Sequence, residues 1–233
     1  MHDMLQFARG PLFRLAFLVM ALGLLRLVIL ALWGIGQMIY RARDHNNPYS
    51  KIVKTTLTWL IPIQRLHRIR PWLSYSSFLF HMGLIVTPIF LLDHIHLWRA
   101  SIGISWPGIP KTAADALTLL VLAAGILLIG IRIFNPYTRR VSGFMDYFLV
   151  LLILFIFSTG FIASRPYNPI PYETSMLIHV LSADLILLLA PFTKIAHCVL
   201  FPLVRMTSEL AWKFPPEAGK DAAIQVHGEV KPI

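Results

Sequence analysis

The chain has 233 residues, of which 57% are hydrophobic and only 14% are charged. A soluble domain of this length would carry about 25% charged residues, so the composition excludes an ordinary cytosolic globule, a disordered chain and a disulfide scaffold. The formal net charge is +10. In a membrane protein such an excess of cations records topology and contact with anionic lipid, and we expect no nucleic-acid partner. The one cysteine, Cys198, excludes an internal disulfide, an iron–sulfur site and covalently attached haem within this chain.

Five hydrophobic segments reach the roughly 20 residues that a helix needs to cross a bilayer. They cover about 13–40, 73–98, 113–134, 144–163 and 175–203. Prolines stand near several of their borders, where the missing N–H is tolerated, and no strand-period alternation competes with the helices. The sequence therefore predicts an all-α, polytopic membrane protein, with a five-transmembrane-helix bundle over 1–213 and a polar tail over 214–233.

Lysine and arginine residues are distributed unevenly between the connecting segments. The first loop, the third loop and the C-terminal region hold most of them, and the alternate segments hold few. The positive-inside rule then predicts the N-terminus outside and the C-terminus, with its tail, in the cytoplasm. Residues 51–70 mix apolar and basic side chains, and we expect this stretch to lie along the inner membrane surface.

Four of the nine histidines lie well inside hydrophobic segments, where an ionisable side chain is costly and indicates function: His81, His94, His179 and His197. His96 is close to the outer end of the second segment. Positions 179 and 197 are five whole turns apart on a continuous helix, so the two rings would face the same way, roughly 27 Å apart. The second and fifth segments run in opposite directions. His81 is therefore expected level with His197, and His94 level with His179.

Two imidazoles from facing helices at one depth are the axial ligand set of a b-type haem. We therefore expect two haem b groups, an inner one held by His81 and His197 and an outer one held by His94 and His179. We choose His94 as the outer ligand of the second segment, because the direction of its side chain around the helix is nearer to the one that pairing with His179 requires. Pro88 can kink the helix and absorb the remaining difference. His96 is the reserve ligand. Zinc fits less well, since it binds three or four ligands at one depth. A proton relay through the histidines stays open, and so does a plain hydrogen bond from each histidine to a neighbouring helix.

Haem propionates need cationic partners, and guanidinium groups bind carboxylates in bidentate fashion. Arg132, Arg139 and Arg140 follow the third segment at the predicted inner end and are the propionate candidates; topology alone is the alternative for each of them. Arg26 lies midway along the first apolar segment, and Asp184 lies within the fifth. Arg26 is expected to face a haem edge, to pair with Asp184 or to belong to a helix longer than the bilayer. Asp184 is expected to carry protons, to orient a ligand or to hydrogen-bond a neighbouring helix.

These residues resemble the gamma subunit of respiratory nitrate reductase, the five-helix dihaem cytochrome b anchor. The similarity lies in LFHMG around His81, in LIHVLSADLILLLAPFTKIAHCVLFP with its two histidines, in RIFNPYTRR, and in IPKTAADALTLL. The wider spacing of the second-segment histidines and the short stretch before the fifth segment are closer to the membrane subunits of heterodisulfide-reductase-like complexes, as in sulfate reducers.

The resemblance implies the membrane electron-transfer subunit of a quinol-linked oxidoreductase, which is no complete enzyme alone, in the inner membrane of a bacterium or archaeon. Its substrate would be menaquinone or ubiquinone, bound near the outer haem with Lys111 matching the family's quinol-site lysine and Asp93 as a proton acceptor. An interfacial lysine that only snorkels is the alternative for Lys111. The implied partner is a cytoplasmic iron–sulfur subunit, heterodisulfide-reductase-like or nitrate-reductase-like; a periplasmic multihaem cytochrome c is a second candidate. A standalone cytochrome b561-like exchanger and a haem-free anchor or transporter stay open.

Overall fold

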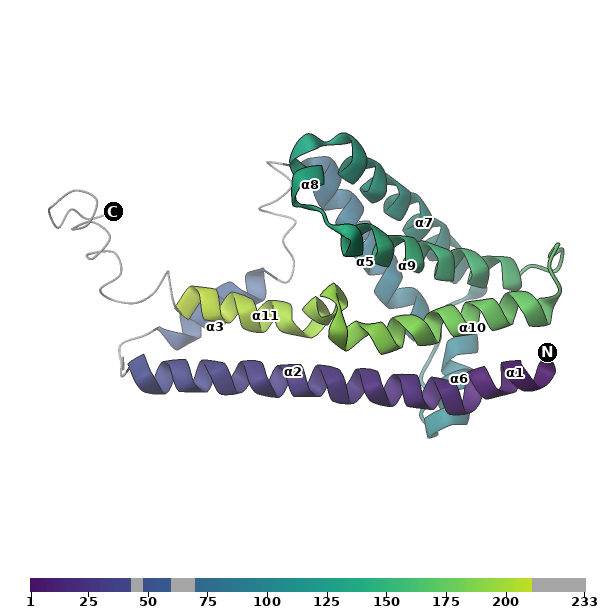
Figure 1. Ribbon diagram of the computed structural model, residues 1–233, viewed down its shortest axis with the longest axis horizontal. Helices are drawn as coiled ribbons and strands as arrows, with labels where there is room; N and C mark the ends of the chain where they lie inside the picture. The colour runs from purple at the N-terminus through teal and green to yellow at the C-terminus, as the bar shows by residue number, and fades with distance from the viewer. Residues whose placement is uncertain (43–47, 60–69, 211–233) are drawn as a thin grey trace, which may run out of the picture. The chain divides into compact units, whose positions relative to one another are not determined.

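The structure is a computed structural model that describes residues 1–42, 48–59 and 70–210 (Figure 1). Across these ranges it is helical, without a β-strand. Five of the described helical stretches are long and apolar enough to cross a membrane: His2–Arg41, Pro71–Phe90, Lys111–Phe134, Phe144–Ala163 and Tyr172–Phe192. The prediction of an all-α protein is confirmed, and so is that of five helices long and apolar enough to cross a membrane. The sidedness of the termini stays a prediction, and the tail at 214–233 lies outside the described residues.

The contacts within the chain define two compact units. The first consists of residues 1–21 and 63–194, and the second of residues 22–62 and 195–233. The first unit contains three of the four predicted haem ligands, His81, His94 and His179. His197 belongs to the second unit.

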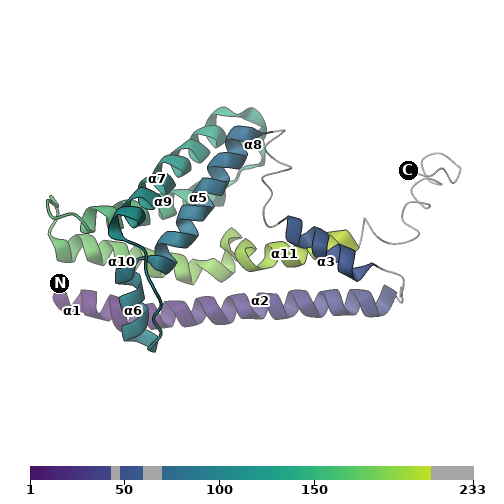
Figure 2. The same cartoon turned by 180° about the vertical axis from the view of Figure 1, so that it is seen from behind.

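The core of the first unit is formed by α5 (Pro71–Phe90), α7 (Lys111–Phe134) and α9 (Phe144–Ala163), which lie together in Figure 2. Its buried side chains are apolar: Phe80, Val121, Ala124, Leu128, Ile153 and Phe157. Small residues allow the helices to approach closely, as is typical of membrane helices. A β-carbon at Gly83 of α5 would lie 2.5 Å from Val121 Cγ2 and 3.1 Å from the carbonyl oxygen of Leu117.

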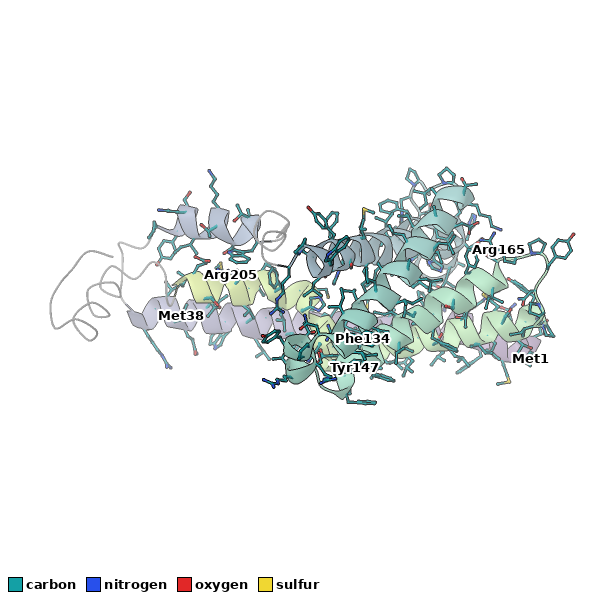
Figure 3. The ribbon with its side chains drawn as sticks, turned by 90° about the horizontal axis from the view of Figure 1, so that it is seen from above. Met1, Met38, Phe134, Tyr147, Arg165 and Arg205 are labelled. Carbon is teal, nitrogen blue, oxygen red and sulfur yellow. The ribbon has the colours of Figure 1, made fainter. Side chains whose placement is uncertain are left out.

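The turn between α7 and α9 contains the short helix α8 (Pro136–Val141). The side chain of Asn135 caps it by accepting hydrogen bonds from the backbone N–H groups of Tyr137 (3.0 Å) and Thr138 (3.2 Å). Tyr147 of α9 donates to the carbonyl of Arg132 (3.4 Å). Figure 3 shows Phe134 and Tyr147 at this end of the helix pair and Arg165 at the other.

The N-terminal helix begins earlier than predicted. Helix α1 (His2–Phe7) passes through a π-helical turn, η1 (Ala8–Leu12), into α2 (Phe13–Ala42). Leu5 and Ala8 pack on Leu177 and Val180 of α10 (Tyr172–Leu189). The helical stretch thus extends to His2 through contacts with α10, while α2 itself begins at Phe13, close to the predicted start.

Two of the predicted membrane helices are interrupted. The segment predicted over 73–98 is two helices, α5 and α6 (Leu92–Ile102), because Leu91 is extended (φ −68°, ψ 127°). The segment predicted over 175–203 is also divided. Two 3₁₀ turns, η2 (Ala190–Phe192) and η3 (Lys194–Ala196), separate α10 from α11 (His197–Ser208), with Thr193 extended between them.

The break between α10 and α11 separates His179 from His197. Five whole turns between His179 and His197 require one continuous helix, and Pro191 in η2 cannot donate the backbone hydrogen bond that continuity needs. The prediction that both rings share one helix face is therefore wrong. The assignment of His197 as a ligand loses the support of that shared face and stays a prediction.

The second unit is described over the later part of α2, α3 (Tyr49–Thr58) and the region of α11. Ile35, Ile52 and Leu210 form its buried core. Arg205 lies 3.9 Å above the ring of Trp59 and pairs with Glu209 at 2.6 Å. The stretch predicted along the membrane surface is helical through Thr58, and its remainder over 60–69 lies outside the described residues.

Candidate haem-ligand site

The structure brings two of the predicted ligands together within the first unit. The ring centroids of His94 on α6 and His179 on α10 are 6.1 Å apart, and the ring planes differ by only 11°. Both side chains are half-buried. The two rings come from helices that are far apart in sequence, so their meeting is a property of the tertiary fold.

Each of these rings is oriented by a backbone carbonyl group. Nδ1 of His94 lies 3.1 Å from the carbonyl oxygen of Pro88, and Nδ1 of His179 lies 3.0 Å from that of Ile156. A carbonyl oxygen only accepts hydrogen bonds, so each Nδ1 carries the proton and donates it. The lone pair is then on Nε2. Metal-binding histidines are oriented in the same way, with the other ring nitrogen donating to a carbonyl or carboxylate group.

The C-terminal end of α5 orients the imidazole ring of His94. Thr87 and Pro88 are among the last residues of the helix, and their carbonyl groups accept from the Leu91 N–H (3.0 Å) and from His94 Nδ1 (3.1 Å). A helix that ends in an apolar environment must have its last carbonyl groups satisfied in some way. The imidazole of His94 does this for one of them, so the helix end and the ring orient each other.

The remaining end carbonyl groups of α5 are satisfied by the loop before α7. Trp106 Nε1 donates to Ile89 (2.8 Å), and the backbone N–H of Ile109 donates to Phe90 (2.9 Å). The chain can therefore leave the helix at Leu91 without an unpaired carbonyl group at these positions. This interruption was missed in the sequence; Pro88, followed by a tryptophan in the next loop, was the signal available.

Helix α6 presents its two histidines differently. His96 is exposed, as is Asp93 in the first helical turn, whereas His94 is half-buried beside His179. Trp98, one turn after His94, packs edge-on against Phe13 (5.7 Å) and Phe17 (4.7 Å). This aromatic cluster holds α6 on the N-terminal helix. An aspartate near a helix N-terminus is favourable electrostatically, which is the structural alternative to a proton-accepting role for Asp93.

The proposed inner ligands lie in different units. His81 on α5 is half-buried, with its Nδ1 2.7 Å from the carbonyl oxygen of Ser77 and its ring 5.7 Å from that of Phe80. Its Nδ1 therefore donates, as in the outer pair. His197 is the first residue of α11 in the second unit. The pairing of His81 with His197 stays a prediction.

Lys111, the candidate quinone residue, begins α7. Its Nζ donates to the carbonyl oxygen of Ser164 at the end of α9 (3.1 Å). Next to this contact Arg165 pairs with Asp115 of α7 (2.7 Å) and lies 3.9 Å above the ring of Phe161. Lys111 is exposed, and it therefore joins two helix ends whether or not it also contacts a quinone.

The three propionate candidates differ in their contacts. Arg132 is half-buried, 3.2 Å from Ser142 Oγ and 3.6 Å from the Asp146 carboxylate, which also accepts from Lys194 (2.7 Å). Arg139 and Arg140 are exposed on α8. Arg132 thus has an acidic partner in the chain, while the other two stay available in the described part for an external anion.

Asp184, within the predicted fifth segment, is buried. It is 2% exposed, and both carboxylate oxygens lack a hydrogen-bond partner within the described residues. An unpartnered buried carboxyl group is costly. Arg26 is exposed on α2 and belongs to the second unit.

The separation of the outer pair can be compared with that of two ligands on one metal ion. Two imidazoles bonded from opposite sides, with metal–nitrogen bonds of about 2 Å, would have their ring centroids roughly 6 Å apart. The observed separation is 6.1 Å. Neither Nε2 is hydrogen-bonded by any residue that the structure describes. Among the same residues no group of three or more histidine, cysteine or acidic side chains is placed to bind a metal, and axial haem ligation requires only two.

Comparison with known proteins gives one relative. A protein of Nitratidesulfovibrio vulgaris (strain Hildenborough) is 32% identical over 209 residues, which cover 87% of this chain and 90% of the relative. The chain belongs to the same family as that protein. The relative's name is given only as "Protein" and states no activity. No family model matches the chain, and no solved structure matches it.

Proposed function

We propose that this chain is the dihaem b-type cytochrome subunit of a respiratory membrane complex. It transfers electrons between a membrane quinol or quinone and a partner iron–sulfur subunit. The observation that carries the proposal is the outer pair, in which His94 and His179 lie 6.1 Å apart. Two separate backbone carbonyl groups hold these rings with Nδ1 protonated. Bound haem supplies one-electron redox chemistry that protein side chains lack.

Backbone carbonyl groups of the chain fix the tautomers of three of the four proposed ligands. Pro88 and Ile156 hold the outer tautomers, and Ser77 holds that of His81 in the same way. Fixed tautomers present neutral Nε2 atoms, the form that binds metal. With one cysteine in the sequence, an iron–sulfur cluster would be carried by a partner, and the cationic distribution favours the cytoplasmic side for its docking.

Haem content is the first test of the proposal. We expect the complex purified from membranes to contain two haem b per chain, with a reducible b-type absorption band, and to copurify with an iron–sulfur subunit. A preparation with no b-type band would leave a haem-free anchor or transporter. Two haems without an iron–sulfur partner would favour the standalone b561-like exchanger.

The inner pairing is tested by two substitutions compared with each other. We expect His81→Ala and His197→Ala to lose the same haem, because each removes one of its two axial ligands, and to keep the other haem. Redox titration and electron paramagnetic resonance (EPR) identify which haem remains. If the two variants lose different haems, the pairing is wrong even though both residues are ligands.

The quinone role of Lys111 is tested separately from its structural hydrogen bond. We expect Lys111→Met to keep both haems and to slow their reduction by a quinol analogue at least tenfold, since the cation and donor are lost while the stem is kept. Ser164 accepts through its backbone, so no side-chain change there copies the effect. Asp115→Asn, which weakens the adjacent Arg165 pair, is the control and should leave the rate unchanged. Equal slowing in both variants would indicate a structural role only.

A further inference from the structure

The ring of His179 lies directly on one turn of α9. Its Nδ1 donates to Ile156 (3.0 Å) and is 3.4 Å from the hydroxyl of Thr159. Gly160 completes this turn, since residues three and four apart share a helix face. A β-carbon at Gly160 would lie 2.7 Å from Cε1 of His179, 3.0 Å from Nδ1 and 3.3 Å from Nε2. The imidazole therefore occupies the space in which any other residue would carry its side chain.

The contact is restrictive because the ring has little freedom to move. Moving away from α9 would stretch the hydrogen bond from Nδ1 to Ile156, and rotating would bring another ring edge against the same turn. The neighbouring ring of His94 is held by the Pro88 carbonyl group, and its plane is 11° from that of His179. Gly160 and the Ile156 carbonyl group together determine both the place and the plane of the ring.

We infer that Gly160 is a positioning residue for His179, and that it holds the two imidazoles of the outer site nearly parallel. This inference rests on the proposed function, because ring planes become measurable through a low-spin haem. The relative orientation of two axial imidazole planes sets the anisotropy of the ferric EPR signal. Parallel planes give a rhombic spectrum, and perpendicular planes give one dominated by a single large g value. The outer haem should therefore be the rhombic one.

The test compares Gly160→Ala with Gly130→Ala in the complete complex. A β-carbon at Gly130 of α7 meets nothing within 4 Å, so this variant is the matched helix-glycine control. We expect Gly130→Ala to keep the wild-type EPR spectrum, midpoint potentials and haem content. Gly160→Ala should shift or remove the rhombic signal, the same signal that is lost on replacement of His179, and leave the other haem's signal unchanged.

Failure of the inference and failure of the proposed function are distinguishable. A wild-type complex without haem overturns the function. A wild-type complex with two haems overturns the inference if Gly160→Ala has the wild-type EPR spectrum and potentials, or if the outer signal is the large-g type.

A second variant covers the case in which Gly160→Ala does not accumulate in membranes. Adding His179→Gly removes the ring that the new methyl group would meet. Accumulation should then recover, a readout that requires no bound haem. If it does not recover, the clash with His179 is not the cause and the inference is overturned.

Discussion

Replacing His179 with alanine is expected to halve the haem content of the purified complex while the other haem is kept. The substitution removes one Nε2 of the outer pair and leaves His94 as a single axial ligand. It also removes the hydrogen bond from His179 to the Ile156 carbonyl group, which then keeps the Thr159 hydroxyl as a side-chain donor (3.0 Å). Pyridine haemochrome quantitation per chain measures the loss, and EPR shows which signal disappears.

The control for this prediction comes from α6. His94→Ala should give the same loss as His179→Ala, because the two rings form one pair at 6.1 Å. His96→Ala should keep both haems, since His96 is exposed two residues away. Loss of a haem in the His96 variant but not in the His94 variant would reverse the assignment and contradict the pairing.

Replacing Gly83 with alanine is expected to destabilise the helical core of the first unit. Its new β-carbon would lie 2.5 Å from Val121 Cγ2 and 3.1 Å from the Leu117 carbonyl oxygen. Val121 is fully buried, and a β-branched side chain cannot easily rotate away. Overpacking of this kind costs about 1–3 kcal/mol. That exceeds the roughly 0.5–1 kcal/mol that replacing a helix-interior glycine with alanine contributes.

Thermal denaturation in detergent measures this effect, with Gly130→Ala as the control. Gly130 has open space around it, so its alanine variant should be unchanged or slightly more stable. Adding Val121→Ala to Gly83→Ala removes the methyl group that clashes. The double variant should therefore be less destabilised than the sum of the two single variants. A simple sum would show that the α5–α7 approach at this point is not the cause.

At the outer site the sequence predicted the candidate ligands but not the helix break that orients one of them. The type and number of the candidate ligands followed from histidines in apolar segments, where a polar ring is costly. The choice of His94 over His96 came from helix rotation and a proposed kink at Pro88, and the structure places His94, not His96, beside His179. The mechanism differs from the one expected. The chain leaves the helix at Leu91, and the direction of α6 follows from that break.

The inner site shows the opposite case. The regular spacing of His179 and His197 suggested one helix face, but regular spacing carries information only while the helix continues. Pro191 and the extended Thr193 interrupt it. A proline among apolar residues does not by itself distinguish a kink from a complete break, because the outcome depends on whether other groups satisfy the freed backbone.

The sequence alone determined that the protein is helical and has five segments long and apolar enough to span a membrane, with His81 and His179 inside two of them. These properties are local, since they depend on the length and hydropathy of contiguous segments. Only the tertiary structure decided that α5 ends at Phe90 and that His179 lies on Gly160. Those outcomes depend on contacts between residues distant in the chain. Trp106 and Ile109 satisfy the end of α5, and α9 leaves space for an imidazole because residue 160 lacks a side chain.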